Sequence, residues 1–372
     1  MQQAYRTDSG YYGERAAGLL ASAEDGTPGA VAAFTRYGAA LTPDDARTVL
    51  AREHGFATWE ELTGHLDGLD TPFARAYRAI EDRDLDGLPA LLDQYPDLVH
   101  ETGTNGNDLL GLAAGTCDER LVRVLLEHGA DPARGNVHGW TPLHQAAYSS
   151  LPWMARVLLD AGAPVDVSGR GDGGTPLVVA LFWGHREVAE LLAARGLAPG
   201  NLRVAAGLGR TDLLDEPDPG AHRGFYRPHS GFPRWRASDD PAEILDEALA
   251  WAARNDRTEA LEALAARGAR LDADVYRGTA LAWAAFTGRA AATRTLLRLG
   301  ADVNRCGTFG GPGHGQGVTA LHLAAQQNHT EVISVLLDAG ADPTIEDENF
   351  HSSALGWAEF FDHPEAAESL RQ

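Results

Sequence analysis

The hydrophobic pattern of the chain alternates between two short motifs, each of which predicts one helix. The first motif, GWTPLHQAA at 139–147, places threonine and proline before a leucine and a pair of alanines. Threonine caps free N–H groups and proline suits the first helical turn, so this motif predicts a helix start. The second motif, VLLDAGA at 157–163, ends an apolar stripe in a glycine of the kind that closes helices. Together they predict two short helices joined by a turn.

Both motifs recur at nearly constant spacing. The closing glycine stands at Gly129, Gly162 and Gly196, and again at Gly268 and Gly300, so the period is 32–34 residues. Alignment on the threonine position gives nine units, which begin near Arg75, Asp108, Thr141, Thr175, Gly200, Glu247, Thr279, Thr319 and Ser353. A repeat of this length stacks helical pairs on one continuous, elongated core.

This pattern resembles the ankyrin-repeat family, whose period is about 33 residues. The resemblance covers residues 71–372 and implies an all-α solenoid of helix-turn-helix pairs with short β-hairpin fingers, about nine units including degenerate terminal ones. It also implies a structural role for His144 and His322, which match the histidine that braces adjacent loops in the family.

Residues 1–70 do not follow the repeat. Thr42 before Pro43 predicts a helix start, and Thr58 with Glu61 forms a capping-box pattern that opens another helix. This stretch resembles the short helical element that precedes ankyrin arrays in some bacterial proteins. We therefore predict an N-terminal helical capping segment over 1–70 and a repeat domain over 71–372.

Charge and composition exclude several classes of function. The chain has 53 acidic and 31 basic residues and a net charge of −22, so nucleic acid and anionic membranes would repel it. Every basic residue counted is arginine, which excludes mechanisms that need a Schiff-base or phosphate-loop lysine. No apolar stretch approaches the length of a membrane helix, and two distant cysteines indicate the reducing cytoplasm.

Two insertions break the period, at 217–240 and 305–317. The first interleaves aromatic and arginine side chains, and its candidate binding residues are Phe225, Tyr226, Arg227, His229, Phe232 and Trp235. Its arginines could hold a carboxylate or phosphate, or merely neutralise the acidic scaffold. The second is rich in glycine and carries Phe309 and His314. Packing of the aromatics onto the solenoid is the alternative to a binding role.

The repeats also carry candidate binding residues. In the family, the two residues after the Ala-Ala pair vary and face the concave groove, and we call them the variable pair. In this chain these positions hold Tyr148, Phe182, Trp183, Phe286, Phe360 and Phe361, and Tyr276 is added as a further candidate binding residue. Trp251, Trp283 and Trp357 stand earlier in the same helices, where filling of the space between repeats is the expected role.

The leading hypothesis is a non-enzymatic binding module that recognises a protein or peptide, one with a basic surface, on the groove and the inserted loops. A second hypothesis is a small-molecule pocket roofed by the insertions, with His229, His314 or Arg227 available for catalysis. A third is a regulatory or immunity-type scaffold. The sequence contains no recognised catalytic motif, so we expect no catalytic residue, cofactor or metal.

Overall fold

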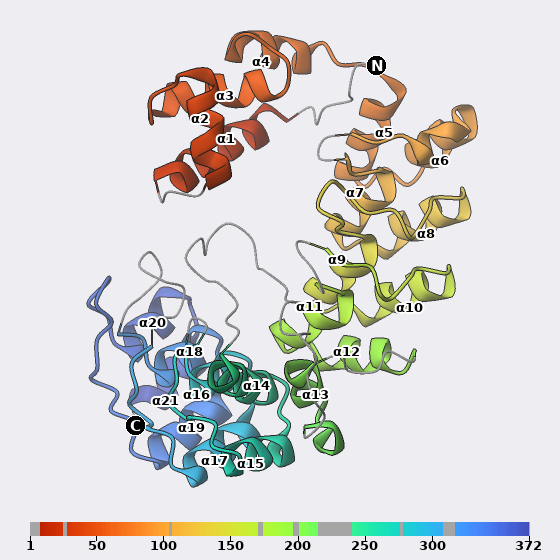
Figure 1. Ribbon diagram of the computed structural model, residues 1–372. Helices are drawn as coiled ribbons and strands as arrows, with labels where there is room; N and C mark the ends of the chain where they lie inside the picture. The colour runs from red at the N-terminus through yellow and green to blue at the C-terminus, as the bar shows by residue number, and fades with distance from the viewer. Residues whose placement is uncertain are drawn as a thin grey trace. The chain divides into compact units, whose positions relative to one another are not determined.

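The computed structural model describes residues 8–24, 28–103, 106–169, 174–195, 201–214, 240–275, 278–307 and 317–371. Within these residues the chain is helical (Figure 1) and divides into two compact units. Unit 1 comprises Met1–Gln145 and Arg156–Pro164, and unit 2 comprises Ala146–Ala155, Val165–Arg227 and Trp235–Gln372, each counted over its described part.

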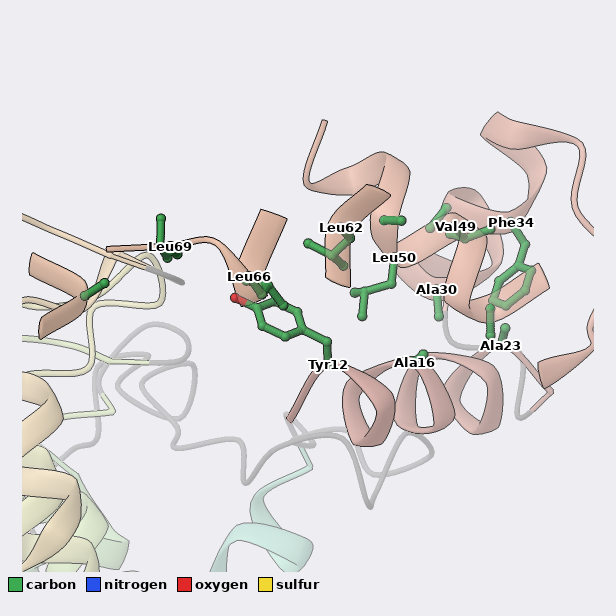
Figure 2. Packing of buried hydrophobic residues seen from close by; sticks show 14 residues of the cluster. Tyr12, Ala16, Ala23, Ala30, Phe34, Val49, Leu50, Leu62, Leu66 and Leu69 are labelled. Carbon is green, nitrogen blue, oxygen red and sulfur yellow. The ribbon is translucent and has the colours of Figure 1, made fainter. Parts of the chain in front are cut away.

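The N-terminal helices of unit 1 form a small core of their own. These helices are α1 (Ser9–Glu24), α2 (Pro28–Tyr37), α3 (Pro43–Glu53) and α4 (Trp59–Asp67). Figure 2 shows their buried cluster, in which Tyr12 of α1 and Leu66 of α4 are almost fully buried. Phe56 and Trp59 pack against this cluster.

The predicted starts of two of these helices are confirmed. The Thr42 side chain caps α3 by accepting from the Asp45 N–H at 3.2 Å, and Thr58 caps α4 by accepting from Glu61 N–H at 3.2 Å. The boundary at residue 70 between capping segment and repeats stays a prediction.

Eight of the nine predicted repeats contain a first and a second helix. The pairs are α5 (Pro72–Glu81) and α6 (Gly87–Gln94), α7 (Leu109–Thr116) and α8 (Glu119–Glu127), α9 (Pro142–Tyr148) and α10 (Pro152–Asp160), α11 (Pro176–Trp183) and α12 (Arg186–Ala193), α14 (Pro241–Arg254) and α15 (Thr258–Ala266), α16 (Ala280–Phe286) and α17 (Ala290–Leu299), α18 (Ala320–Gln326) and α19 (Thr330–Asp338), and α20 (Ala354–Phe360) and α21 (Pro364–Arg371). A short 3-10 turn, η1 (Pro96–His100), follows α6.

The fifth repeat is different. Its first helix is α13 (Leu202–Leu208), and the described residues after it form only the 3-10 turn η3 (Thr211–Leu213) in place of a second α-helix. The four repeats that follow are regular, with α14, α16, α18 and α20 packed in one row and α15, α17, α19 and α21 in another (Figure 1).

The expected β-hairpin fingers correspond to the turns between repeats. Within the described residues two of these turns carry an isolated antiparallel bridge, Gly307 with Val318 and Glu346 with Ser353, and none forms an extended strand. The Gly307 N–H donates to the Val318 carbonyl at 2.9 Å and closes the base of the second insertion. Stacked helices, rather than strand pairing, hold the repeats together.

Candidate functional site

The two structural histidines lie where the family resemblance placed them. In unit 1, His144 is fully buried, and its Nδ1 accepts from the Thr141 N–H at 3.1 Å. In unit 2, His322 repeats the contact with Thr319 at 3.2 Å, and its Nε2 lies 3.1 Å from the Ser352 carbonyl of the next repeat. Burial lowers the pKa of His322, which favours the neutral ring that these contacts require.

The fifth repeat replaces this histidine with a buried ion pair. Arg203 occupies the histidine position of α13, and Glu247 occupies the threonine position of α14. Both side chains are almost fully buried and hydrogen-bonded to each other. Burial raises the pKa of Glu247, while the guanidinium of Arg203 acts in the opposite direction. The pair therefore joins α13 to α14, in a repeat whose described residues hold no second α-helix.

A cluster of aromatic rings surrounds Arg254 next to this ion pair. The guanidinium carbon lies 3.6 Å from the centroid of the Trp283 ring and 4.4 Å from that of Phe182. The Phe182 and Trp251 ring centroids are 6.1 Å apart, and all three rings are buried. We call Arg254, Phe182, Trp251 and Trp283 the arginine cluster.

The arginine cluster corrects one predicted site residue. Phe182 was expected to face a partner, but its side chain is fully buried beneath Arg254. The expectation for Trp251, Trp283 and Trp357 is confirmed, since each is at least nine-tenths buried between helices. Phe182 is therefore part of the core.

The cluster forms because the fourth repeat contacts the sixth and the seventh directly. Arg254 Nη1 donates to the Phe182 carbonyl at 2.9 Å, and Asn255 Nδ2 donates to the Leu181 carbonyl at 2.8 Å. Two glycines permit this approach. A Cβ atom on Gly184 would lie 2.7 Å from the Arg254 carbonyl oxygen, and one on Gly207 would lie 3.2 Å from Leu181.

Tyr148 and Trp183 are the predicted site residues that the structure brings together near the surface. Their ring centroids are 5.7 Å apart in an edge-to-face arrangement, and 37% of Tyr148 is exposed. Trp183 is half-buried, and its indole Nε1 is a buried donor that has no hydrogen-bond acceptor among the described residues. Phe286, also half-buried, contacts Trp283 edge-to-face with centroids 5.7 Å apart.

The other predicted site residues lie outside the described residues. These are Phe225, Tyr226, Arg227, His229, Phe232, Trp235, Tyr276, Phe309 and His314. The small-molecule pocket and its catalytic histidines depend on them and stay a prediction. Across the part of the chain that the structure describes, no three His, Cys, Asp or Glu side chains gather as a metal site would need.

Sequence reasoning missed the arginine cluster and one exposed aromatic. Phe350, in the turn before α20, is 67% exposed. In α20 itself, Phe360 is 83% exposed and Phe361 41% exposed, and their rings meet edge-to-face at 5.1 Å. The variable-pair rule singles out Phe360 and Phe361, whereas Phe350 lies in a turn where no periodic pattern applies.

A cationic or histidine side chain bridges successive repeats. In five repeats of unit 2 the residue just before the second helix contacts a carbonyl oxygen near the end of the preceding repeat's first helix. The pairs are His185 Nδ1 with Ala147 at 2.8 Å, Arg257 Nε with Gly207 at 3.0 Å, Arg289 Nε with Arg254 at 3.0 Å, His329 Nε2 with Phe286 at 3.2 Å and His363 Nε2 with Gln326 at 3.0 Å. We call these contacts the repeat bridges.

Among the described residues no helix is both long and apolar enough to cross a membrane. Family models agree with the helical pairs: a model of three ankyrin repeats matches residues 76–169 and 237–306, and a single-repeat model matches 316–348. Together these matches cover more than half of the chain.

Comparison with individual proteins gives low sequence identities. The ankyrin repeat protein FPV022 of Fowlpox virus is 25% identical over 73% of this chain and 42% of its own length. Protein PhlB of Serratia liquefaciens is 34% identical over 30% of this chain and 48% of its own length, and human Rabankyrin-5 is 32% identical over 68% and 24%. The chain spans less than half the length of these relatives.

Among solved structures, the human ASB11 ankyrin repeat domain is 23% identical, and the match covers 80% of this chain and 96% of that one with a TM-score of 0.33. The family rests on the repeat models and on the observed helical pairs with their buried, threonine-linked histidines. On these grounds the chain belongs to the ankyrin-repeat family.

Proposed function

We propose that this chain is a non-enzymatic binding protein, whose unit 2 recognises a protein or peptide through the variable pairs of its first helices. Membership of the ankyrin-repeat family supports a general role in binding, because ankyrin repeats are in general protein–protein interaction modules. A fold by itself does not assign a partner, so the proposal that the variable pairs bind the partner depends on particular side chains.

The Tyr148–Trp183 pair carries the proposal. Tyrosine and tryptophan are the residues most often found at the energetic centre of interfaces, because each offers a large rigid surface with one polar group. No described residue accepts a hydrogen bond from the buried indole N–H of Trp183, and a buried donor is costly unless a partner or water accepts from it. A carbonyl or carboxylate oxygen of a bound peptide would supply that acceptor, after a small movement of Tyr148.

Charge indicates what kind of partner fits. None of the variable pairs of unit 2 contains a carboxylate, whereas the described turns at 268–275, 300–307 and 340–353 hold seven carboxylates against two arginines. A partner with apolar anchors and basic flanking residues would match both features. Complementary charge of this kind raises the rate of association and selects partners more than it raises affinity.

We also expect the chain to work in a reducing compartment such as the cytoplasm. Its two cysteines, Cys117 and Cys306, are free and exposed thiols. In an oxidising compartment, exposed thiols of this kind would be open to disulfide formation with other molecules.

Photo-crosslinking with affinity measurement tests the proposal. A crosslinker at position 148 is used to identify partners, and the affinity of each partner is then measured for wild type, Tyr148→Ser and Trp183→Phe. Trp183→Phe keeps the ring packing but removes the N–H donor. We expect each variant to weaken binding about tenfold or more.

Glu187→Gln supplies the matched control, because Glu187 lies in the first turn of the second helix α12 and is absent from every variable pair. It should bind as wild type does. Equal affinity for wild type, Tyr148→Ser and Trp183→Phe would remove the variable pairs from the interface and overturn the proposal.

A further inference from the structure

Two arginines from later repeats bracket the backbone of Trp183 at the end of α11. Arg254 Nη1 donates to the Phe182 carbonyl at 2.9 Å, and Arg289 Nη2 donates to the Gly184 carbonyl. Arg289 Nε also donates to the Arg254 carbonyl at 3.0 Å. A guanidinium group therefore lies against the carbonyl on each side of Trp183, whose indole N–H has no acceptor among the described residues.

The positive charge of Arg254 extends to the Trp183 side chain. Its guanidinium carbon lies 4.4 Å from the Phe182 centroid, which is 5.2 Å from the Trp183 centroid, so it stands within about 10 Å of the Trp183 ring, close to the screening length of salt. Arg254 is almost fully buried and Arg289 is half-buried, and buried charges are screened less than exposed ones. Arg254 would therefore attract an anion at the Trp183 ring.

The carboxylates near these arginines are engaged with other groups. Asp256 lies 3.7 Å from Arg186, and Glu190 lies 2.8 Å from Arg257. In the described part of the chain no carboxylate forms an ion pair with Arg289. Burial, and after it the charge of Arg186, lower the pKa of Arg289. The surroundings of Arg289 therefore favour an added anion, although the whole chain has a net charge of −22.

Trp183 lies within a row of aromatic rings. Its centroid is 5.7 Å from that of Tyr148 on one side. On the other side the row runs from Phe182 through Trp283 to Phe286, with centroids 6.1 Å and 5.7 Å apart. Tyr148 is 37% exposed and Phe286 is half-buried. A partner that covers both therefore passes over Trp183, so the group that meets its N–H belongs to a side chain within the bound segment.

We infer that Trp183, Arg254 and Arg289 select a partner segment that carries an aspartate or glutamate between its apolar anchors. The carboxylate accepts a charge-assisted hydrogen bond from Trp183 Nε1, which is about twice as strong as the bond of a neutral carbonyl. Basic residues of the partner then lie further out, at the acidic turns. The inference rests on the proposed function, because it names the group of the partner that reaches Trp183.

Two blocked tripeptides of the same shape test this inference. They are acetyl-Phe-Asp-Phe-amide and acetyl-Phe-Asn-Phe-amide, which differ by one negative charge. Each is titrated into the full chain with isotope-labelled tryptophan, in which the indole signal lost in Trp183→Phe belongs to Trp183. We expect the aspartate peptide to move this signal and to bind at least about tenfold more tightly than the asparagine peptide.

Removal of one charge separates the field from the packing. Arg289→Gln should weaken the aspartate peptide about threefold or more and leave the asparagine peptide unchanged, which also shows that the variant folds. Arg294→Gln is the control, since Arg294 is exposed on α17 and pairs with Glu331 at 2.8 Å, so the aspartate peptide should bind within about twofold of wild type. In wild type, raising the salt from about 0.05 M to about 0.5 M should reduce the preference for aspartate severalfold.

Four results would each overturn the inference: equal affinities of the two peptides, an unmoved Trp183 signal, a preference that salt does not change, or an unchanged aspartate affinity in Arg289→Gln. A third peptide, acetyl-Phe-Asn-Phe with a free terminal carboxylate, tests the other source of charge. If it binds more tightly than the aspartate peptide, the site takes a chain end and the inference is wrong. A partner identified through position 148 that loses affinity in Trp183→Phe would leave the proposed function standing in all of these cases.

Discussion

Arg254 holds Phe182 through both its ring and its backbone. The guanidinium carbon lies 4.4 Å from the ring centroid, and Nη1 donates to the Phe182 carbonyl at 2.9 Å, across 72 residues of sequence. A planar guanidinium suits this double contact, because its faces stack on aromatic rings while its edge donates hydrogen bonds. One side chain thereby ties the fourth repeat to the sixth.

Substitution of Arg254 should therefore destabilise unit 2 strongly. Arg254→Ala would leave a cavity between Phe182 and Trp283 and a carbonyl without its donor, for a loss of about 3 kcal/mol in the free energy of unfolding. Urea denaturation followed by tryptophan fluorescence measures this loss. Arg267→Ala is the control, since Arg267 is exposed at the end of α15 and donates to the Ala263 carbonyl of that helix. A loss of under about 0.5 kcal/mol in Arg254→Ala would show that the stacking contributes little.

Gly184→Ala should show that the close approach of the repeats needs glycine. Gly184 has a positive φ of 74°, and an added Cβ would lie 2.7 Å from the Arg254 carbonyl. Gly268 has a similar φ of 94° with nothing within 4 Å of the added atom. Gly268→Ala should therefore cost only the backbone strain, about 1 kcal/mol, and Gly184→Ala about 2 kcal/mol more. Equal urea midpoints for the two variants would contradict the close approach.

The sequence predicts the repeats well and the arginine cluster not at all. Thr141 with His144 and the regular closing glycines come from local capping and packing rules, so the period, the helical pairs and the nine units follow from the pattern. The contact between Arg254 and Phe182 joins two non-adjacent repeats, the fourth and the sixth, across 72 residues of sequence. No periodic rule contains that information, so Phe182 was placed on the surface although it is buried.

Exposure at the variable pairs was predictable only in part. Tyr148, Phe360 and Phe361 face solvent as their positions suggest, because these helix positions point away from the neighbouring repeats. Gly207 and Arg254 occupy the same positions yet make close contacts inside unit 2. Whether a variable position meets solvent or another repeat is decided by tertiary packing, not by its place in the repeat.

Asp108→Asn should stabilise unit 1 at neutral pH. The Asp108 carboxyl caps α7 by accepting from the Gly111 N–H at 2.8 Å, while no described residue donates a hydrogen bond to its buried Oδ2. Burial raises the pKa of Asp108 from 3.8 to about 6. The folded state therefore holds the proton more tightly, so Asp108 contributes most stability below about pH 4 and loses it as the pH rises through 6.

Asparagine caps a helix as well as aspartate does and carries no charge. Its amide nitrogen would take the place of the unpaired Oδ2 without gaining an acceptor, so we expect a net gain of about 1–2 kcal/mol at pH 7.5 and none near pH 4. Asp44→Asn, at an exposed position on α3, is the control. Thermal unfolding of wild type and variant at pH 7.5 and near pH 4 tests this expectation. A variant less stable than wild type at pH 7.5 would refute the prediction.

The repeat bridges should make unit 2 labile to mild acid. Burial lowers the pKa of His185 and of His329 below the ordinary value of 6.5. A histidine whose pKa is lower in the folded state than in the unfolded state stabilises the fold while its ring is neutral. This contribution to the free energy of unfolding is complete above pH 6.5 and is lost as the pH falls through the lowered pKa of the folded state. For each proton taken up on unfolding, stability should fall by up to about 1.4 kcal/mol per pH unit.

His329→Gln separates this titration from the bridge itself. The glutamine amide can reach the Phe286 carbonyl as the His329 Nε2 does, at 3.2 Å in the wild type, but it does not titrate. We expect the variant to lose less stability than wild type between pH 7.5 and 5, because one buried histidine no longer takes up a proton on unfolding. His351→Gln, at an exposed position in the turn before α20, should keep the wild-type slope. Identical slopes for wild type and His329→Gln would show that His329 does not carry the acid sensitivity.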